Sequence, residues 1–115
     1  FLGGGSQLWT VTAGDVLNYS YMLLGKTMIL TWQFQTTTVG GTAHQHLIVR
    51  LPAGYLAART IINTFAFVDN GTGGSGYCFT TANTGLLKFN RADSANWTAS
   101  TNNTAVHGQI AFEVQ

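Results

Sequence analysis

The sequence has 115 residues, of which 45% are hydrophobic and only 8% are charged, and its formal net charge is +1. An average globular domain carries about 25% charged residues, so this composition excludes a disordered chain and the basic patch that nucleic-acid binding requires. The single cysteine, Cys78, excludes an intrachain disulfide, and no stretch contains the roughly 18 apolar residues of a membrane-inserted helix.

The length predicts a single domain, which we place at residues 7–115. Residues 1–6, with three consecutive glycines, are typical of a linker or a cut end. Short strand candidates follow at 7–12 and 16–22. From 26 to 36 the large apolar residues fall on every second position, which indicates a half-buried strand; they are Met28, Leu30, Trp32 and Phe34.

Turn residues divide the rest of the chain. Gly40-Gly41 predicts a tight hairpin into a second strand that ends at Pro52, since proline cannot donate a ladder hydrogen bond. Residues 53–59 are the one helical turn that we expect. The remaining strands are predicted at 60–69, 75–81, 85–90 and 106–114, with a glycine-rich reversal at 70–76 and a polar loop at 92–103.

About eight short strands separated by turn signals predict an all-β fold. We expect an antiparallel β-sandwich with a jelly-roll-like arrangement. A small closed barrel is the alternative.

Catalytic groups are sparse in this sequence. The four acids lie far apart along the chain, and no nucleophile elbow or phosphate-binding loop is present. Cys78 lies between aromatic neighbours on a predicted strand, where a free cysteine usually behaves as a small buried hydrophobe. We therefore expect no enzyme and no bound cofactor.

Two histidines are candidates for a metal site. His44 and His46 are two positions apart on a predicted strand, so both side chains project from one face. Two imidazoles on one face suit a metal ion if a third ligand comes from elsewhere, for example from other copies around a three-fold axis. The alternative is a hydrogen-bonded or interface pair.

The polar loops contain candidates for carbohydrate contacts. Trp97 lies in the polar loop, where it is either exposed for stacking on a ligand or a plug at one end of the core. The other candidates offer uncharged polar groups suited to sugar hydroxyls; they are Asn70, Asn96, Asn102 and Tyr77. Sequence matches to the glycosylation sequon occur at Asn18, Asn70, Asn96 and Asn102.

Three segments in this order carry a resemblance to a known class of protein: YMLLGKTM at 21–28, LIVRLPAGY at 47–55 and GQIAFEV at 108–114. The pattern resembles small β-rich domains of tailed-bacteriophage structural proteins, of the tail-fibre tip or head-fibre and decoration type. The resemblance implies a homotrimer on the virion surface. It also implies that a His-x-His strand can hold a metal ion on a trimer axis, a role that falls to His44 and His46.

These observations predict a non-enzymatic fibre-tip domain that binds host-surface glycan through loops 69–76 and 92–104. One alternative is a capsid decoration or fibre-attachment protein that contacts only other virion proteins. A second alternative is a secreted lectin-like domain, for which the four sequons would be relevant.

Overall fold

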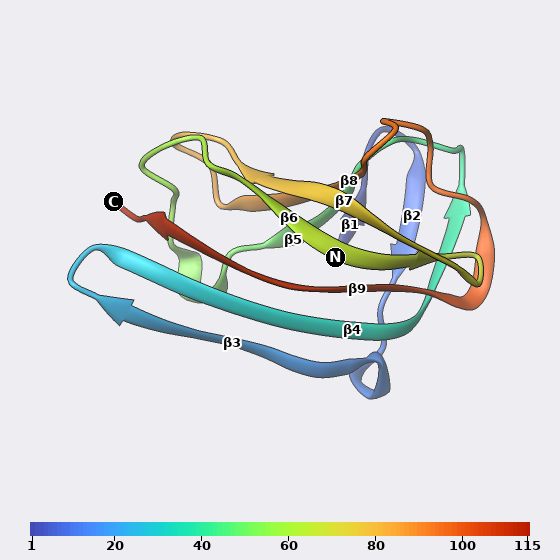
Figure 1. The fold of residues 1–115 in the computed structure, drawn as a ribbon, viewed down its shortest axis with the longest axis horizontal. Coiled ribbons are helices and arrows are strands. Elements are labelled where there is room, and N and C mark those ends of the chain that lie inside the picture. Colours follow the sequence, from blue (N-terminus) through green and yellow to red (C-terminus); the bar gives the residue numbers. More distant parts are fainter.

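The computed structural model describes residues 1–115 and consists almost entirely of β-strands (Figure 1). Only two 3-10 turns interrupt them, η1 at Ala13–Asp15 and η2 at Pro52–Gly54, so no helix is long and apolar enough to cross a membrane. The strands are β1 Leu2–Gly3, β2 Gln7–Thr10, β3 Val16–Leu24, β4 Thr27–Gly41, β5 Leu47–Arg50, β6 Ile62–Asp69, β7 Thr72–Thr80, β8 Leu86–Arg91 and β9 Ser100–Glu113.

All pairings between strands are antiparallel, and the nine strands form one sheet. Eight of them follow the order β1-β5-β8-β7-β6-β9-β4-β2, and β3 lies off this path and pairs with β4. The sheet curls until it is nearly closed, so its two walls face each other as the layers of a sandwich do (Figure 1). The prediction of an antiparallel all-β fold with about eight strands is confirmed. The walls belong to one continuous sheet rather than to two separate ones.

Strand β4 organises the sheet because it pairs along both edges. One edge pairs with β9 over most of its length, from Thr27 opposite Glu113 to Val39 opposite Ser100. The other edge pairs first with β3 and then, beyond a bulge around Thr36, with β2. Thr36 has a φ of 52°, which is the left-handed geometry expected at such an irregularity.

The core lies between the two walls and follows the alternation seen in the sequence. Every second residue of β4 is buried from Met28 to Phe34, and beyond the bulge the alternation resumes one position later, at Thr37 and Val39. The four predicted core residues are all 0–1% exposed. The ring of Phe89 from β8 packs against Trp32 at 5.3 Å and against Phe65 at 5.2 Å between ring centroids. Aromatic residues from three strands therefore join the two walls.

Residues 1–6, which we expected to be a linker or a cut end, are part of the sheet. Leu2 and Gly3 pair with Ile48 and Leu47 of β5, and the Phe1 ring packs edge-on against Phe34 at 5.0 Å. The segment then turns directly into β2. It folds into the domain because it covers one end of the core and contributes ladder hydrogen bonds.

The tight hairpin predicted at Gly40-Gly41 does not form. Strand β4 continues through both glycines, which pair with Leu8 and Gln7 of β2, and residues 42–46 then cross to β5 without pairing to β4. Gly41 has a φ of 71°, and a Cβ there would lie 2.4 Å from the Ser6 carbonyl oxygen. The glycine therefore serves a close approach to the turn before β2.

Strand β3 is the free edge of the sheet. It pairs only with β4, and across a seam on its other side its side chains contact the segment around β5 and η2. Two contacts bridge this seam: the Tyr19 hydroxyl donates to the Arg50 carbonyl, and the rings of Tyr21 and Tyr55 meet edge-on at 6.0 Å. Most of the strand is exposed to solvent.

Candidate binding site

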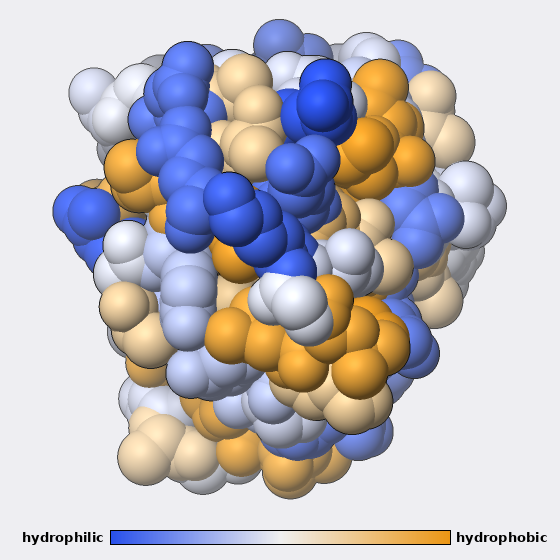
Figure 2. Space-filling view, turned by 90° about the vertical axis from the view of Figure 1, so that its left-hand side faces the viewer, coloured by the Kyte–Doolittle hydropathy of each residue, from blue (hydrophilic) through white to orange (hydrophobic).

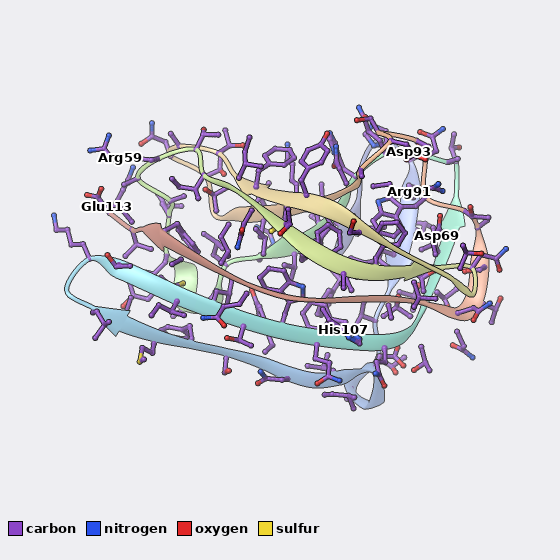
Figure 3. All side chains as sticks on the ribbon, viewed as in Figure 1. Arg59, Asp69, Arg91, Asp93, His107 and Glu113 are labelled. Atoms are coloured by element: carbon purple, nitrogen blue, oxygen red, sulfur yellow. The ribbon has the colours of Figure 1, made fainter.

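Several loops meet at one end of the barrel, at the right of Figure 1. Strand β6 ends there at Asp69 and turns through Asn70-Gly71 into β7, and β8 ends there at Arg91 before the 92–99 connection to β9. Figure 3 shows Asp69, Arg91 and Asp93 close together at this end. Charged residues from neighbouring strand ends are therefore gathered in one place.

A network of charge-assisted hydrogen bonds fixes this cluster. The Arg91 guanidinium donates from Nη1 to Asp69 Oδ2 at 2.9 Å and from Nη2 to Asp93 Oδ2 at 2.8 Å. Thr98 donates its backbone N–H to Asp69 Oδ1 at 3.1 Å and its hydroxyl to Oδ2 at 3.1 Å. The Asp69 side chain is only 4% exposed, and these partners hold its carboxylate in one orientation.

Asp93 is positioned by the same loop. The Ala95 backbone N–H donates to Asp93 Oδ1 at 3.0 Å. This hydrogen bond, followed by the nearby Arg91 charge, lowers the pKa of Asp93 below its usual range. One guanidinium thus faces two carboxylates, and the cluster carries a net negative charge.

Beside this cluster lies a shallow hollow of about 350 Å³. Two of its lining residues are glycines, and a Cβ at Gly74 would lie 2.8 Å from the Phe67 ring, so this ring packs directly against the glycine. Phe67 is the one hydrophobic residue among those that line it. The lining residues are Phe67, Asp69, Asn70, Thr72, Gly73, Gly74, Arg91 and Thr98.

The structure brings two of the predicted asparagines to this end. Asn70 lines the hollow and accepts a hydrogen bond from the Asn103 side chain at 3.4 Å. Asn102, which precedes Asn103, accepts a hydrogen bond at its Oδ1 from the Thr38 hydroxyl at 3.2 Å. Asn96 is exposed in the 92–99 connection and does not line the hollow.

Trp97 does not have the exposed stacking role that we considered for it, and it instead plugs the core. Its side chain is buried, with only 1% of the residue exposed, and its indole N–H donates to the carbonyls of Gln45 at 3.1 Å and Phe89 at 3.2 Å. Its ring also packs edge-on against Phe67 at 5.1 Å. Trp97 therefore anchors the loop that supplies Thr98 to the hollow.

Tyr77 lies on β7 away from the hollow. Its ring stacks against Phe79 at 6.1 Å, and its hydroxyl lies 3.3 Å from Ser94 Oγ and 2.9 Å from the Asn90 side-chain amide. These contacts place Tyr77 as a half-buried support for the 92–99 connection.

The two histidines lie in the crossing between β4 and β5, not on a strand as predicted. The backbone of this crossing forms hydrogen bonds with other loops instead of with a neighbouring strand. The Trp97 N–H donates to the His44 carbonyl at 3.1 Å, and the Gly4 N–H donates to the His46 carbonyl at 2.9 Å. The imidazole centroids are 5.1 Å apart. His44 Nδ1 accepts from the His46 backbone N–H at 3.1 Å, and His46 Nδ1 lies 2.5 Å from the Asn90 amide.

These contacts match the hydrogen-bonded alternative for the histidine pair. Within the chain, no group of three or more His, Cys, Asp or Glu side chains is arranged to hold a metal ion. A metal ion shared between copies on a symmetry axis remains a prediction.

The other candidate reactive groups have structural partners. Asp15 Oδ1 accepts from the Thr36 hydroxyl at 2.7 Å, and Glu113 pairs with Arg59 at 3.0 Å at the opposite end of the molecule (Figure 3). Burial raises the pKa of Cys78 to about 12, so its thiol stays protonated near neutral pH.

The main feature of the site, the cluster of Asp69, Arg91 and Thr98, could not be inferred from local sequence patterns. Asp69 read as an ordinary turn residue, and no pattern linked it to Arg91, 22 positions later. The one local signal is Arg91 followed two residues later by Asp93, an unusual pair of charges in so weakly charged a chain.

Comparison with known proteins adds no relative: no family model, curated protein or solved structure matches this chain.

Proposed function

We propose that the chain is a non-enzymatic adhesion domain of a phage virion, and that it binds a neutral host-surface glycan in the hollow beside Asp69 and Arg91. One observation carries the proposal, namely a polar hollow whose charged groups are already fixed by hydrogen bonds. The phage context comes from the sequence resemblance alone.

The chemistry of the hollow favours a sugar over other small ligands. Side chains of Asn70, Thr72 and Thr98 offer neutral donors and acceptors, and the Phe67 ring offers an apolar surface. The net negative charge around Arg91 disfavours phosphate and acidic sugars. The hollow is at the lower end of the roughly 300–1,000 Å³ typical of ligand sites, which suits a short neutral saccharide.

A glycan array with two matched variants tests this function. Thr72 pairs with Asp69 across the hairpin, so the larger side chain of Thr72→Tyr points to the same face and fills the hollow. We expect the wild type to bind neutral glycans and Thr72→Tyr to bind at least tenfold more weakly. Thr64→Tyr is the control, because Thr64 is exposed on the same hairpin and does not line the hollow.

Two results would contradict the proposal. One is a folded wild-type protein that binds no glycan on the array. The other is equal binding by the wild type and Thr72→Tyr.

A structural role in the virion is the second candidate, and the exposed apolar residues of β3 favour it. A decoration or fibre-attachment domain needs apolar surface for contact with its neighbours. Locating the chain on the particle distinguishes the two roles, because a decoration protein lies across junctions between capsid subunits. A secreted lectin-like domain would instead carry glycans at its sequons, which mass spectrometry of native material detects.

A further inference from the structure

Strand β3 exposes large apolar side chains beside its free edge. Figure 2 shows hydrophobic side chains gathered in the lower half of the end that carries the β3–β4 turn, below a band of polar residues. Five large apolar residues of β3 are 37–61% exposed: Leu17, Tyr21, Met22, Leu23 and Leu24. Their exposure is unexpected in a strand of a stable domain, since such side chains are usually buried.

Strand β3 also lacks the features that normally protect an edge. Exposed edge strands usually carry a lysine, a proline, an inward-pointing charge or a bulge. From Asn18 to Leu24 the strand has no charge and no proline, and its pairing with β4 is regular. Its one irregularity lies between Val16 and Asn18. Every second residue of this regular seven-residue segment therefore directs its backbone N–H and C=O groups away from β4, where they are unpaired.

The sequence of this regular segment is complementary to itself. Its midpoint is Tyr21, and antiparallel pairing of two copies about that residue places Tyr21 opposite Tyr21 and Tyr19 opposite Leu23. Ser20 then faces Met22, and Asn18 faces Leu24. Aromatic and aliphatic residues meet across the strands, which stabilises antiparallel pairs.

We propose that β3 pairs with β3 of a second copy of this chain about a two-fold axis at Tyr21, which joins the two sheets. No charged residue lies on the strand, so two copies bring no like charges together. A two-fold contact uses the same surface on both partners. It therefore differs from the three-fold arrangement that the phage resemblance implies, and it is independent of glycan binding.

The surface area that the two copies would bury in this contact fits a reversible dimer. Half of a large apolar side chain is on the order of 80 Å², so the four exposed ones in the paired segment of each copy contribute about 640 Å² to the contact. The paired backbone adds to this area. Interfaces below about 1,200 Å² are typically weak or transient, so the dimer should dissociate on dilution.

Cross-linking through an introduced cysteine tests the pairing. In Tyr21→Cys the two new thiols lie opposite each other, and mild oxidation should give a covalent dimer as the main product. Ile62→Cys is the control, because Ile62 is 66% exposed but lies on β6, and it should cross-link only slowly. The buried Cys78 thiol leaves the background low.

A second pair of variants, each with one introduced cysteine, tests the register. Ser20→Cys and Met22→Cys should each cross-link slowly alone and quickly when mixed, because these positions face each other only across the proposed axis. Equal cross-linking of the separate and mixed proteins would overturn the register at Tyr21.

The mass of the protein in solution provides the third test. We expect the wild type to change from monomer to dimer as its concentration rises. Met22→Lys should raise the dissociation constant at least tenfold, because it places a charge at the contact. Leu8→Lys, at a more exposed residue of β2, should leave the constant unchanged. A monomer at all concentrations, or a trimer that Met22→Lys leaves intact, would overturn the proposal.

Discussion

At the scale of single residues, Trp97 shows how one side chain closes an end of the barrel. Its N–H lies within hydrogen-bonding distance of two backbone carbonyls, those of Gln45 and Phe89. In Trp97→Phe the smaller ring leaves a cavity at this buried position, and both carbonyls lose their donor. We expect the free energy of unfolding to fall by about 2 kcal/mol, as measured by urea denaturation. An unchanged free energy of unfolding would mean that the hydrogen bonds of the Trp97 side chain do not stabilise the fold.

Asp15 gives the domain a specific sensitivity to acid. Its carboxylate accepts hydrogen bonds from the Thr12 backbone N–H at 2.8 Å and from the Thr36 hydroxyl at 2.7 Å, and the bond from Thr12 is the main cause of its lowered pKa. The stabilisation is therefore complete above the unfolded pKa of about 3.9. It is lost as the pH falls through the lower pKa of the folded state.

The variant Asp15→Asn tests this sensitivity. It cannot bind or release the proton, so its stability should fall less than that of the wild type between pH 6 and pH 3. At pH 6 we expect it to be about 1 kcal/mol less stable than the wild type. Urea midpoints at both pH values provide the measurement, and an identical pH dependence in the two proteins would contradict the assignment.

At the scale of elements, the β4–β9 ladder depends on one close approach. Gly108 lies opposite Trp32, and a Cβ at Gly108 would lie 2.7 Å from Trp32 Cζ2 and 3.0 Å from Phe65 Cβ. Gly108→Ala should therefore force the two rings apart and lower the thermal unfolding midpoint, at a cost of about 1–3 kcal/mol.

Gly40 offers the matched control for this substitution. It lies on β4, and a Cβ there would meet nothing within 4 Å. Gly40→Ala should leave the midpoint unchanged or raise it slightly, because it reduces the freedom of the unfolded chain. Equal destabilisation by both substitutions would show that crowding at Trp32 is not the cause.

The sequence predicted the elements whose side chains alternate between core and solvent. Strand β4 is the best example, because its period of two is visible in the residues and is fulfilled in the burial pattern. The hairpin predicted at Gly40-Gly41 was wrong, because a Gly-Gly pair is found both in tight hairpin turns and where two backbone segments approach closely. Only the contact between Ser6 and Gly41 distinguishes the close approach from the hairpin, and these two residues are far apart in the sequence.

The candidate binding site was less predictable for the same reason. Asn70 could be proposed as a ligand-contacting residue from its place in a local turn. The orientation of the Asp69 carboxylate depends on Arg91 and Thr98, which lie on other elements. Trp97 sits in a polar segment, and its burial depends on carbonyls of distant residues. Hydropathy along the chain does not contain this information.

At the scale of the whole molecule, the two proposed surfaces lie on different elements. The hollow is formed by β6, β7, β8 and the connection to β9, whereas the free edge is β3, which pairs only with β4. Pairing through β3 therefore leaves both hollows of a dimer open. Under the two proposals together, the two hollows of one dimer would bind a glycan-coated surface with an avidity above the affinity of either hollow.

The central position of β9 has a consequence for how the domain folds. Strand β9 lies between β4 and β6, so these two strands are joined only after residues 100–113 have been synthesised. Its ladder with β4 connects distant parts of the chain, and such non-local pairing makes folding slow. Before β9 docks, β4 and β6 each expose an open edge. The interval before closure is therefore the stage at which newly made chains are most vulnerable to aggregation.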